Sequence, residues 1–145
     1  MADERVFVGD LTRKEFRERI EAGTIKAAIV PTAATEQHNE HLHMIHDTFH
    51  ASYMAEHAAQ KLLPQVVVAT PVGIGVSEHW MRHIGTLTVR PEIFCEYVQN
   101  ILDELMAGNR GALSDFMYQE TQRVLGSVAV LRIPGKPEDL GGGIG

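Results

Sequence analysis

The stretch AAIVPTAATEQHNEHLHMIHDT, residues 27–48, decides how the rest of this sequence is interpreted. It opens with an apolar run, residues 27–30, which predicts a buried strand that ends at Pro31. The polar segment that follows places carboxylates and imidazoles within twelve residues: Glu36, His38, His41, His43, His46 and Asp47. These groups are ligands of divalent metals, so the segment indicates a metal site at the end of a strand.

The distribution of histidine supports a special role for this region. All eight histidines lie between His38 and His83, and the first quarter of the sequence has none. Packing alone does not explain such clustering. A plainer alternative stays open, in which Glu36, His38 and Asp47 form a solvated polar loop with Asp47 as the N-cap of a helix.

Size and composition narrow the class of protein. A chain of 145 residues fits one domain, for which we expect residues 1–133, followed by a glycine- and proline-rich tail over 134–145. The formal charge of −6 argues against binding to a nucleic-acid backbone. The single Cys95 suits a reducing compartment, and no apolar run is long enough for a signal peptide or a membrane span. We therefore expect a cytoplasmic protein that binds neither nucleic acid nor membrane.

Helical and extended patterns alternate along the first three quarters of the chain. Helices are predicted from Thr12 to Gly23, from near Asp47 to Leu63, and from Pro91 to Gly108, with strands over Lys26–Val30 and Gln65–Thr70 between them. This alternation predicts an α/β fold with a parallel sheet and helices on its faces. The alternation then breaks, because a helical stretch, Leu113–Leu125, follows directly, before a last strand, Val128–Ile133.

Two motifs resemble those of the creatininase (creatinine amidohydrolase) family. The first is Glu36-Gln37-His38-x-x-His41-Leu42 followed by Asp47-Thr48. The second, Gly75-Val76-Ser77-Glu78-His79 followed by Gly85-Thr86, is similar to the family's G-x-S-x-E-H…G-T loop with one residue fewer between serine and glutamate. Each motif follows a predicted strand, and the resemblance covers roughly residues 11–107.

The resemblance implies a metal-dependent hydrolase with a three-layer α/β/α fold and a mostly parallel sheet, usually a homo-oligomer. It implies two divalent ions, zinc or manganese with iron as a further option. Glu36 would bind one ion, His38 the other, and Asp47 both. Ser77 would contact a small-molecule substrate, with Glu78 and His79 as catalytic groups. A metal-bound hydroxide would then attack the carbonyl of a cyclic or small amide.

The sequence also departs from the family pattern. Family members have an N-G-H-x-x-N segment after the next strand, with a further metal-ligand histidine, whereas this sequence has no histidine after His83. Asn39-Glu40 stands where the family has Gly-Pro, and His43 and His46 are additional. We therefore expect an incomplete fold that lacks one central strand and the C-terminal part.

These observations leave several functions open. The first is hydrolysis of a C–N bond in a cyclic or small amide, and a related option is ring opening of a lactone or cyclic ketone. The second is a catalytically silent relative that persists as an assembly partner or fragment. The third is a histidine-rich metal-binding module without chemistry.

Overall fold

The computed structural model describes residues 5–106 and 129–132. The elements, in chain order, are η1 (Val8–Asp10), α1 (Arg13–Glu21), β1 (Ala27–Val30), α2 (His46–Lys61), β2 (Val66–Val68), η2 (Glu78–Trp80), α3 (Pro91–Met106) and β3 (Ala129–Arg132). The predicted helices and strands before residue 107 are all present, with slightly different bounds. The predicted helical stretch Leu113–Leu125 and the tail 134–145 lie outside the described residues.

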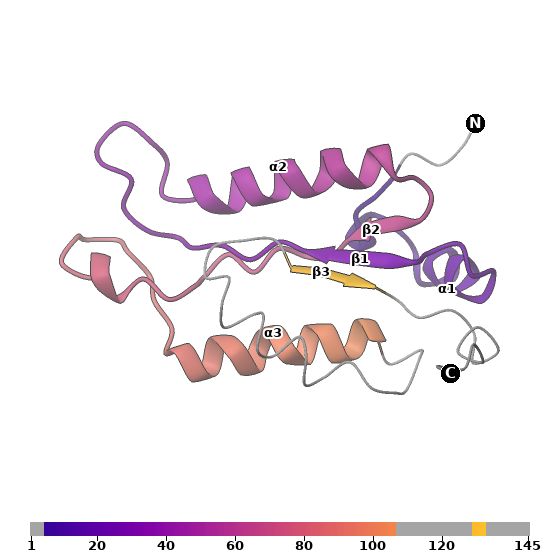
Figure 1. Cartoon of the computed structure of the whole chain (residues 1–145). Coiled ribbons are helices and arrows are strands. Elements are labelled where there is room, and N and C mark those ends of the chain that lie inside the picture. The colour runs from indigo at the N-terminus through magenta and orange to yellow at the C-terminus, as the bar shows by residue number, and fades with distance from the viewer. Residues whose placement is uncertain (1–4, 107–128, 133–145) are drawn as a thin grey trace, which may run out of the picture.

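The sheet has the order β2-β1-β3, so β1 is its central strand (Figure 1). Strands β1 and β2 are parallel, with Ala28 opposite Val67. Strand β3 runs antiparallel to β1, with Leu131 opposite Ala28. The sheet is therefore mixed in direction, as in many α/β proteins that carry one antiparallel strand on an otherwise parallel sheet.

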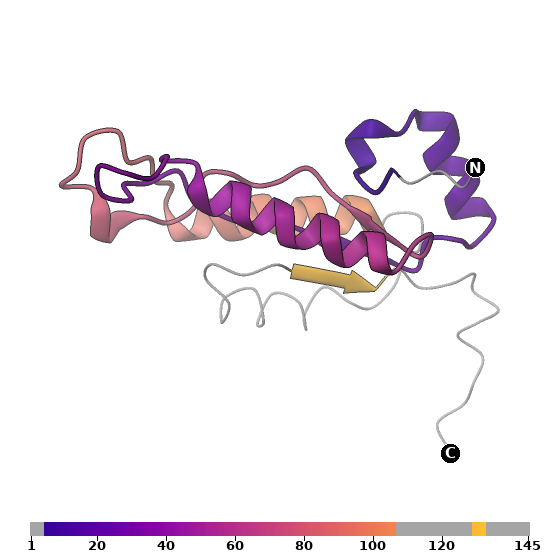
Figure 2. The same cartoon turned by 90° about the horizontal axis from the view of Figure 1, so that it is seen from above.

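Helices cover both faces of this sheet, which confirms the predicted three-layer α/β/α arrangement. Figure 1 shows α2 on one face and α3 on the other, and Figure 2 shows α2 lying along the strands. On the α2 side, Ile29 of β1 packs in a core cluster with the small residues Ala55 and Ala59. On the α3 side, Val30 packs with three residues spaced four apart on the helix: Phe94, Val98 and Leu102. Successive β1 residues thus face opposite helices, which is why the strand is apolar without alternation.

Local signals account for the beginnings of two helices. The Thr12 hydroxyl accepts a hydrogen bond from the Glu15 backbone N–H (3.3 Å), and the Glu15 carboxylate accepts one from the Thr12 backbone N–H (2.7 Å). This reciprocal pair is the capping box expected from the sequence, and it satisfies two amides that the helix leaves free. Pro91 occupies the first position of α3, where its missing N–H costs nothing.

None of the helices in the described residues has the length and apolar character that crossing a bilayer demands.

Candidate metal centre

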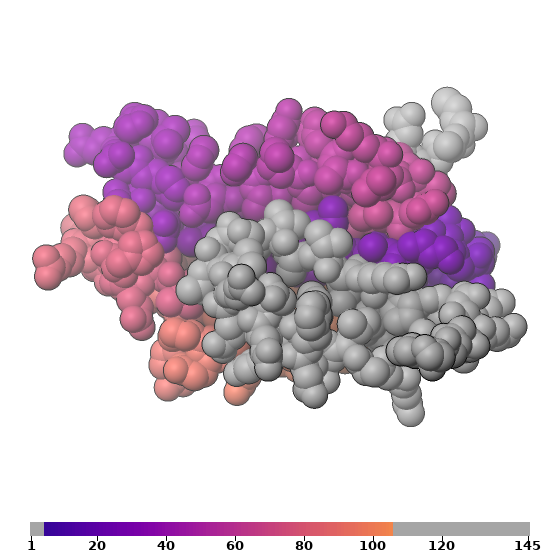
Figure 3. Space-filling view, in the orientation of Figure 1, coloured from indigo at the N-terminus to yellow at the C-terminus, as the bar shows by residue number. Residues whose placement is uncertain are grey.

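The loops that follow β1 and β2 lie together at the carboxyl ends of these two strands. In Figures 1 and 3 they form the left-hand end of the molecule, the first in violet and the second in rose. A parallel bridge between Thr32 and Val72 extends the strand pairing into the loops. Open α/β sheets bind ligands at the carboxyl ends of their strands, so this end is the natural place for a site.

A close approach of two backbones holds these loops together. A Cβ atom placed on Gly75 would lie 2.6 Å from the carbonyl oxygen of Ala33. Only glycine allows the two chains to come this close. Gly75 of the second motif therefore fixes the position of the segment that leads into Glu36.

Hydrogen bonds between the two motifs also hold these loops together. The backbone N–H of Gln37 donates to the buried Thr86 hydroxyl (3.2 Å), and the backbone N–H of Leu87 donates to the Thr35 carbonyl (2.9 Å). The Thr35 hydroxyl in turn donates to the Gly73 carbonyl (2.7 Å). Thr86 thus positions the residue between Glu36 and His38, a role that the motif alone did not reveal.

Asn39 shows why this segment tolerates a departure from the family pattern. Its φ of 58° lies in the left-handed region that favours glycine. Asparagine adopts this conformation more readily than most other residues. Asn39, at a position where the resemblance leads us to expect glycine, therefore suits the turn after His38.

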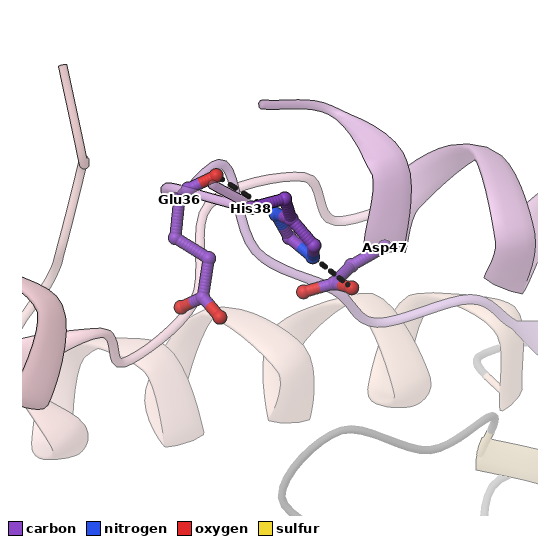
Figure 4. A group of neighbouring side chains, drawn as sticks. All are labelled: Glu36, His38 and Asp47. Atoms are coloured by element: carbon purple, nitrogen blue, oxygen red, sulfur yellow. Dashed lines mark hydrogen bonds and ion pairs between the residues drawn. The ribbon is translucent and has the colours of Figure 1, made fainter. Parts of the chain in front are cut away.

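The structure brings Glu36, His38 and Asp47 together, as Figure 4 shows. One ligand atom from each lies within 4.8 Å of the other two. The His38 Nδ1–H donates to the backbone carbonyl of Glu36 (2.9 Å), and Nε2 lies 2.9 Å from Oδ1 of Asp47. The two segments that supply these groups are the loop after β1 and the first turn of α2.

The hydrogen bonds of His38 favour its protonated form. Both ring nitrogens face acceptors, and an imidazole can donate through both only when it is protonated. The Glu36 carbonyl is the main cause that raises the pKa of His38 above its ordinary value of 6.5, and the Asp47 carboxylate raises it further, against the opposing effect of burial. These contacts favour a positive charge beside the Asp47 carboxylate, which is where a cation would also lie.

The N-cap alternative for Asp47 does not hold. Residue Ile45 is the N-cap of α2, and no side chain caps the helix there. Asp47 lies in the first helical turn instead, with its carboxylate directed at His38. Asp47 therefore does not cap the helix but belongs to the cluster with Glu36 and His38.

The three side chains suit a divalent metal. Two carboxylates and one imidazole form a donor set that zinc and manganese accept. The carbonyl of Glu36 holds the His38 ring through Nδ1, which leaves Nε2 for a metal, as in most histidine ligands of metalloproteins. Side chains with exposed fractions of 16% (His38) and 38% (Asp47) leave a route for an ion to enter.

A cavity of about 870 Å³ adjoins the cluster. Glu36 and Asp47 line it, and so do Glu78 and His79 of the second motif. The motifs predicted these four residues, but the wall also contains residues that neither motif includes, among them His50, Met54 and Phe94. His50 follows Asp47 by three residues on α2, so helical periodicity could have placed it on the same face.

Ser77 does not line this cavity, although its neighbours Val76 and Glu78 do. Its side chain is fully buried, and in the part of the chain that the structure describes its hydroxyl has no hydrogen-bond partner. The backbone N–H of Ser77 donates to the Thr88 hydroxyl (2.9 Å). Substrate contact by Ser77 therefore stays a prediction from the resemblance.

The fold and the cluster define a three-layer α/β/α protein with an acidic and imidazole ligand group at the carboxyl ends of its parallel strands. The chain belongs to the creatininase family: the family model described as creatinine amidohydrolase matches residues 9–111. None of the curated proteins compared with the chain matches it.

Solved creatininase structures share the fold. A crystal structure of creatinine amidohydrolase is 28% identical, with a TM-score of 0.65 over 71% of this chain and 40% of its own. A glutamate-to-glutamine variant of creatininase, described as Zn-Zn type, is 28% identical, with a TM-score of 0.64 over 71% of this chain and 41% of its own. The same kind of variant complexed with creatine is 27% identical, with a TM-score of 0.62 over 70% of this chain and 40% of its own. The chain thus spans about 40% of the length of these relatives.

Proposed function

We propose that the chain binds zinc or manganese through Glu36, His38 and Asp47, and that this site hydrolyses the C–N bond of a cyclic or small amide. One observation carries the proposal: three ligand atoms from two segments converge within 4.8 Å beside a cavity. Membership of the creatininase family supports the class of metal-dependent amidohydrolases. The Zn-Zn type of one solved relative supports zinc as a metal.

Each residue has a separate part in this proposal. A divalent cation, when bound, polarises a substrate carbonyl and lowers the pKa of a coordinated water. Asp47 and Glu36 supply the negative charge, and the Glu36 carbonyl orients the His38 ring. In the cavity wall, Glu78 can accept a proton and His79 can donate one to the leaving nitrogen.

The first experiment measures metal content. The purified full chain is dialysed against Zn²⁺ or Mn²⁺ and its metal is determined by elemental analysis. His38→Ala and Asp47→Asn are expected to weaken binding by about 10- to 100-fold or more, because each removes a donor. Glu40→Gln is the matched control, since Glu40 is an exposed carboxylate of the same loop outside the ligand group. Equal metal content in all four proteins would refute the metal site.

The second experiment measures turnover. The metal-loaded chain is tested on a panel of lactams, formamides, lactones and cyclic ketones, with Glu78→Gln as the variant expected to lose activity while keeping its metal. Hydrolysis of lactones or ketones without amides would favour the ring-opening alternative. No turnover by a folded, metal-loaded chain would reject the hydrolase.

Metal binding without turnover is the second candidate function. Three protein ligands and water suffice to hold one zinc ion, so the cluster could bind metal independently of any chemistry. In that case metal uptake by the Glu36, His38 and Asp47 cluster would survive Ser77→Ala and Glu78→Gln but fail with His38→Ala.

A homo-oligomer is also proposed. Helix α2 and the turn before it expose several large apolar side chains, which a second copy would cover: Ile45, Phe49, Tyr53 and Met54. Sedimentation equilibrium measures the mass directly, and a monomer at high concentration would contradict the proposal.

A further inference from the structure

Helix α2 carries two histidines that the candidate metal centre does not use. His46 is the first residue of the helix and His50 follows four residues later, so both lie on the same helix face. Their ring planes are within 6° of parallel and the ring centroids lie 6.2 Å apart. His46 is half-buried and His50 is exposed, so solvent reaches the pair.

We propose that His46 and His50 form a second, chelating site for a later first-row transition metal such as Ni²⁺, Cu²⁺ or Zn²⁺. Histidines four apart on a helix can bind one ion together, as they do in H-E-x-x-H helices. With metal–nitrogen distances of ~2.0–2.1 Å, a tetrahedral ion needs the two nitrogens about 3.4 Å apart. The ring centroids are 6.2 Å apart, so the proposal requires the exposed His50 ring to rotate toward His46 until one nitrogen of each ring reaches that separation. Imidazole favours these metals over Mg²⁺ and Ca²⁺.

Nearby carboxylates make this end of the helix suitable for a cation. The N-terminus of a helix carries partial positive charge and disfavours cations. Here, Asp47 lies between the two histidines in sequence, and Glu36 and Asp47 line the same cavity as His50. Their negative charge offsets the helix dipole.

The histidine pair is distinct from the candidate metal centre but adjoins it. The ring of His46 meets the ring of His38 edge-on, with the centroids 5.2 Å apart. The ligand atoms that converge within 4.8 Å belong to Glu36, His38 and Asp47, and neither His46 nor His50 is among them. The two candidate sites therefore share no ligand residue.

In the test, Ni²⁺ is titrated into the untagged full chain, and isothermal titration calorimetry measures its binding. His46→Ala and His50→Ala are each expected to weaken one class of Ni²⁺ site by about 100-fold, because a lone imidazole lacks the chelate advantage. The double variant is expected to lose that class. Alanine is the best helix former, so α2 should persist, which circular dichroism verifies.

His57→Ala is the matched control. His57 is also an exposed histidine of α2, but the residues one turn away are Tyr53 and Lys61, so neither offers a second imidazole for chelation. This variant should bind Ni²⁺ as the unmodified chain does. An equal loss in His57→Ala, or unchanged binding in the double variant, would overturn the proposal.

A further variant separates this site from the candidate metal centre. His38→Ala removes a ligand of that centre and should leave the His46–His50 site intact. Electron paramagnetic resonance of bound Cu²⁺ should then show two histidine nitrogens in His38→Ala and one in His38→Ala/His50→Ala. Loss of all Ni²⁺ and Cu²⁺ binding in folded His38→Ala would mean a single shared site and would refute the second one, whatever the hydrolase assays give.

Discussion

Replacing Gly75 by alanine tests the contact that joins the two motifs. The added methyl group would lie 2.6 Å from the Ala33 carbonyl oxygen and 3.6 Å from the Ala34 Cβ, whereas real Cβ contacts stay above 3.0 Å. Relief requires a separation of the two backbones by about 0.4 Å, which is 3.0 Å minus 2.6 Å. Both Gly75 and Ala33 are buried, so no flexible side chain can absorb this movement.

The cost follows from what the movement disturbs. Ala33 donates its N–H to the Val72 carbonyl (2.8 Å), and the Gly75 carbonyl accepts from the N–H of Val89 (3.1 Å). Overpacking of a buried position costs about 1–3 kcal/mol. For a chain of this size that lowers Tm by about 3–10 °C. Because Ala33 lies three residues before Glu36, metal binding should weaken as well.

Gly9→Ala is the control. A methyl group added to Gly9 would meet no atom within 4 Å, and Gly9 has no positive φ, so alanine fits there without strain. Urea unfolding of both variants gives the free energies of unfolding. If Gly75→Ala unfolds at the same urea concentration as Gly9→Ala, the close contact between Gly75 and the Ala33 carbonyl does not stabilise the two loops.

Two further predictions concern proton-linked behaviour. Because the pKa of His38 is raised, protons should compete with a metal for its ring at higher pH than they do for an ordinary histidine. The Kd for Zn²⁺ should therefore fall as the pH rises through and above 6.5. A Kd that does not change between about pH 5.5 and 8 would argue against His38 as a ligand. At the capping box, the side chain of Arg5 and then the backbone and hydroxyl of Thr12 lower the pKa of Glu15 from 4.5 to about 2. The stability that ionised Glu15 contributes should be complete above pH 4.5 and lost as pH falls toward 2. Thr12→Ala should lower the free energy of unfolding by about 1 kcal/mol, because it removes the cap of α1. If circular dichroism shows that Glu15→Gln and the unmodified chain lose structure at the same acid pH, ionised Glu15 does not stabilise the fold.

Local patterns predicted the parts of the fold that depend on neighbours in sequence. The capping box at Thr12 and the first turn at Pro91 require only residues within a few positions, so the sequence revealed them. The direction of β3 depends on pairing with β1, about a hundred residues earlier, and no local pattern encodes it. For the same reason the burial of Ser77 could not be predicted from its motif, which specifies order along the chain and not depth in the fold.

The candidate site shows the same division between local and long-range information. The family resemblance placed Glu36, His38 and Asp47 in one cluster, and the structure brings them within 4.8 Å. The resemblance could not supply the part of the cavity wall that Phe94 of α3 forms, because neither motif includes that helix. Helical periodicity could have suggested that His50 shares a helix face with Asp47. That inference needs to know where the helix begins, and the structure shows that α2 begins at His46.

The two motifs act as one structural unit, and this explains why a family pattern recognises them in a chain with 28% identity to the solved relatives. The first motif supplies the candidate ligands Glu36, His38 and Asp47, and the second motif holds its backbone through Gly75 and Thr86. A loop that must place three ligand atoms within a few ångströms loses conformational entropy, and contacts made before a metal arrives offset that loss in advance. The contacts of His38 have a similar effect, because the Glu36 carbonyl and the Asp47 carboxylate hold the ring in place. In the proposed metal site the Glu36 carbonyl already orients the His38 ring, so a bound cation would not have to supply the free energy that orders it.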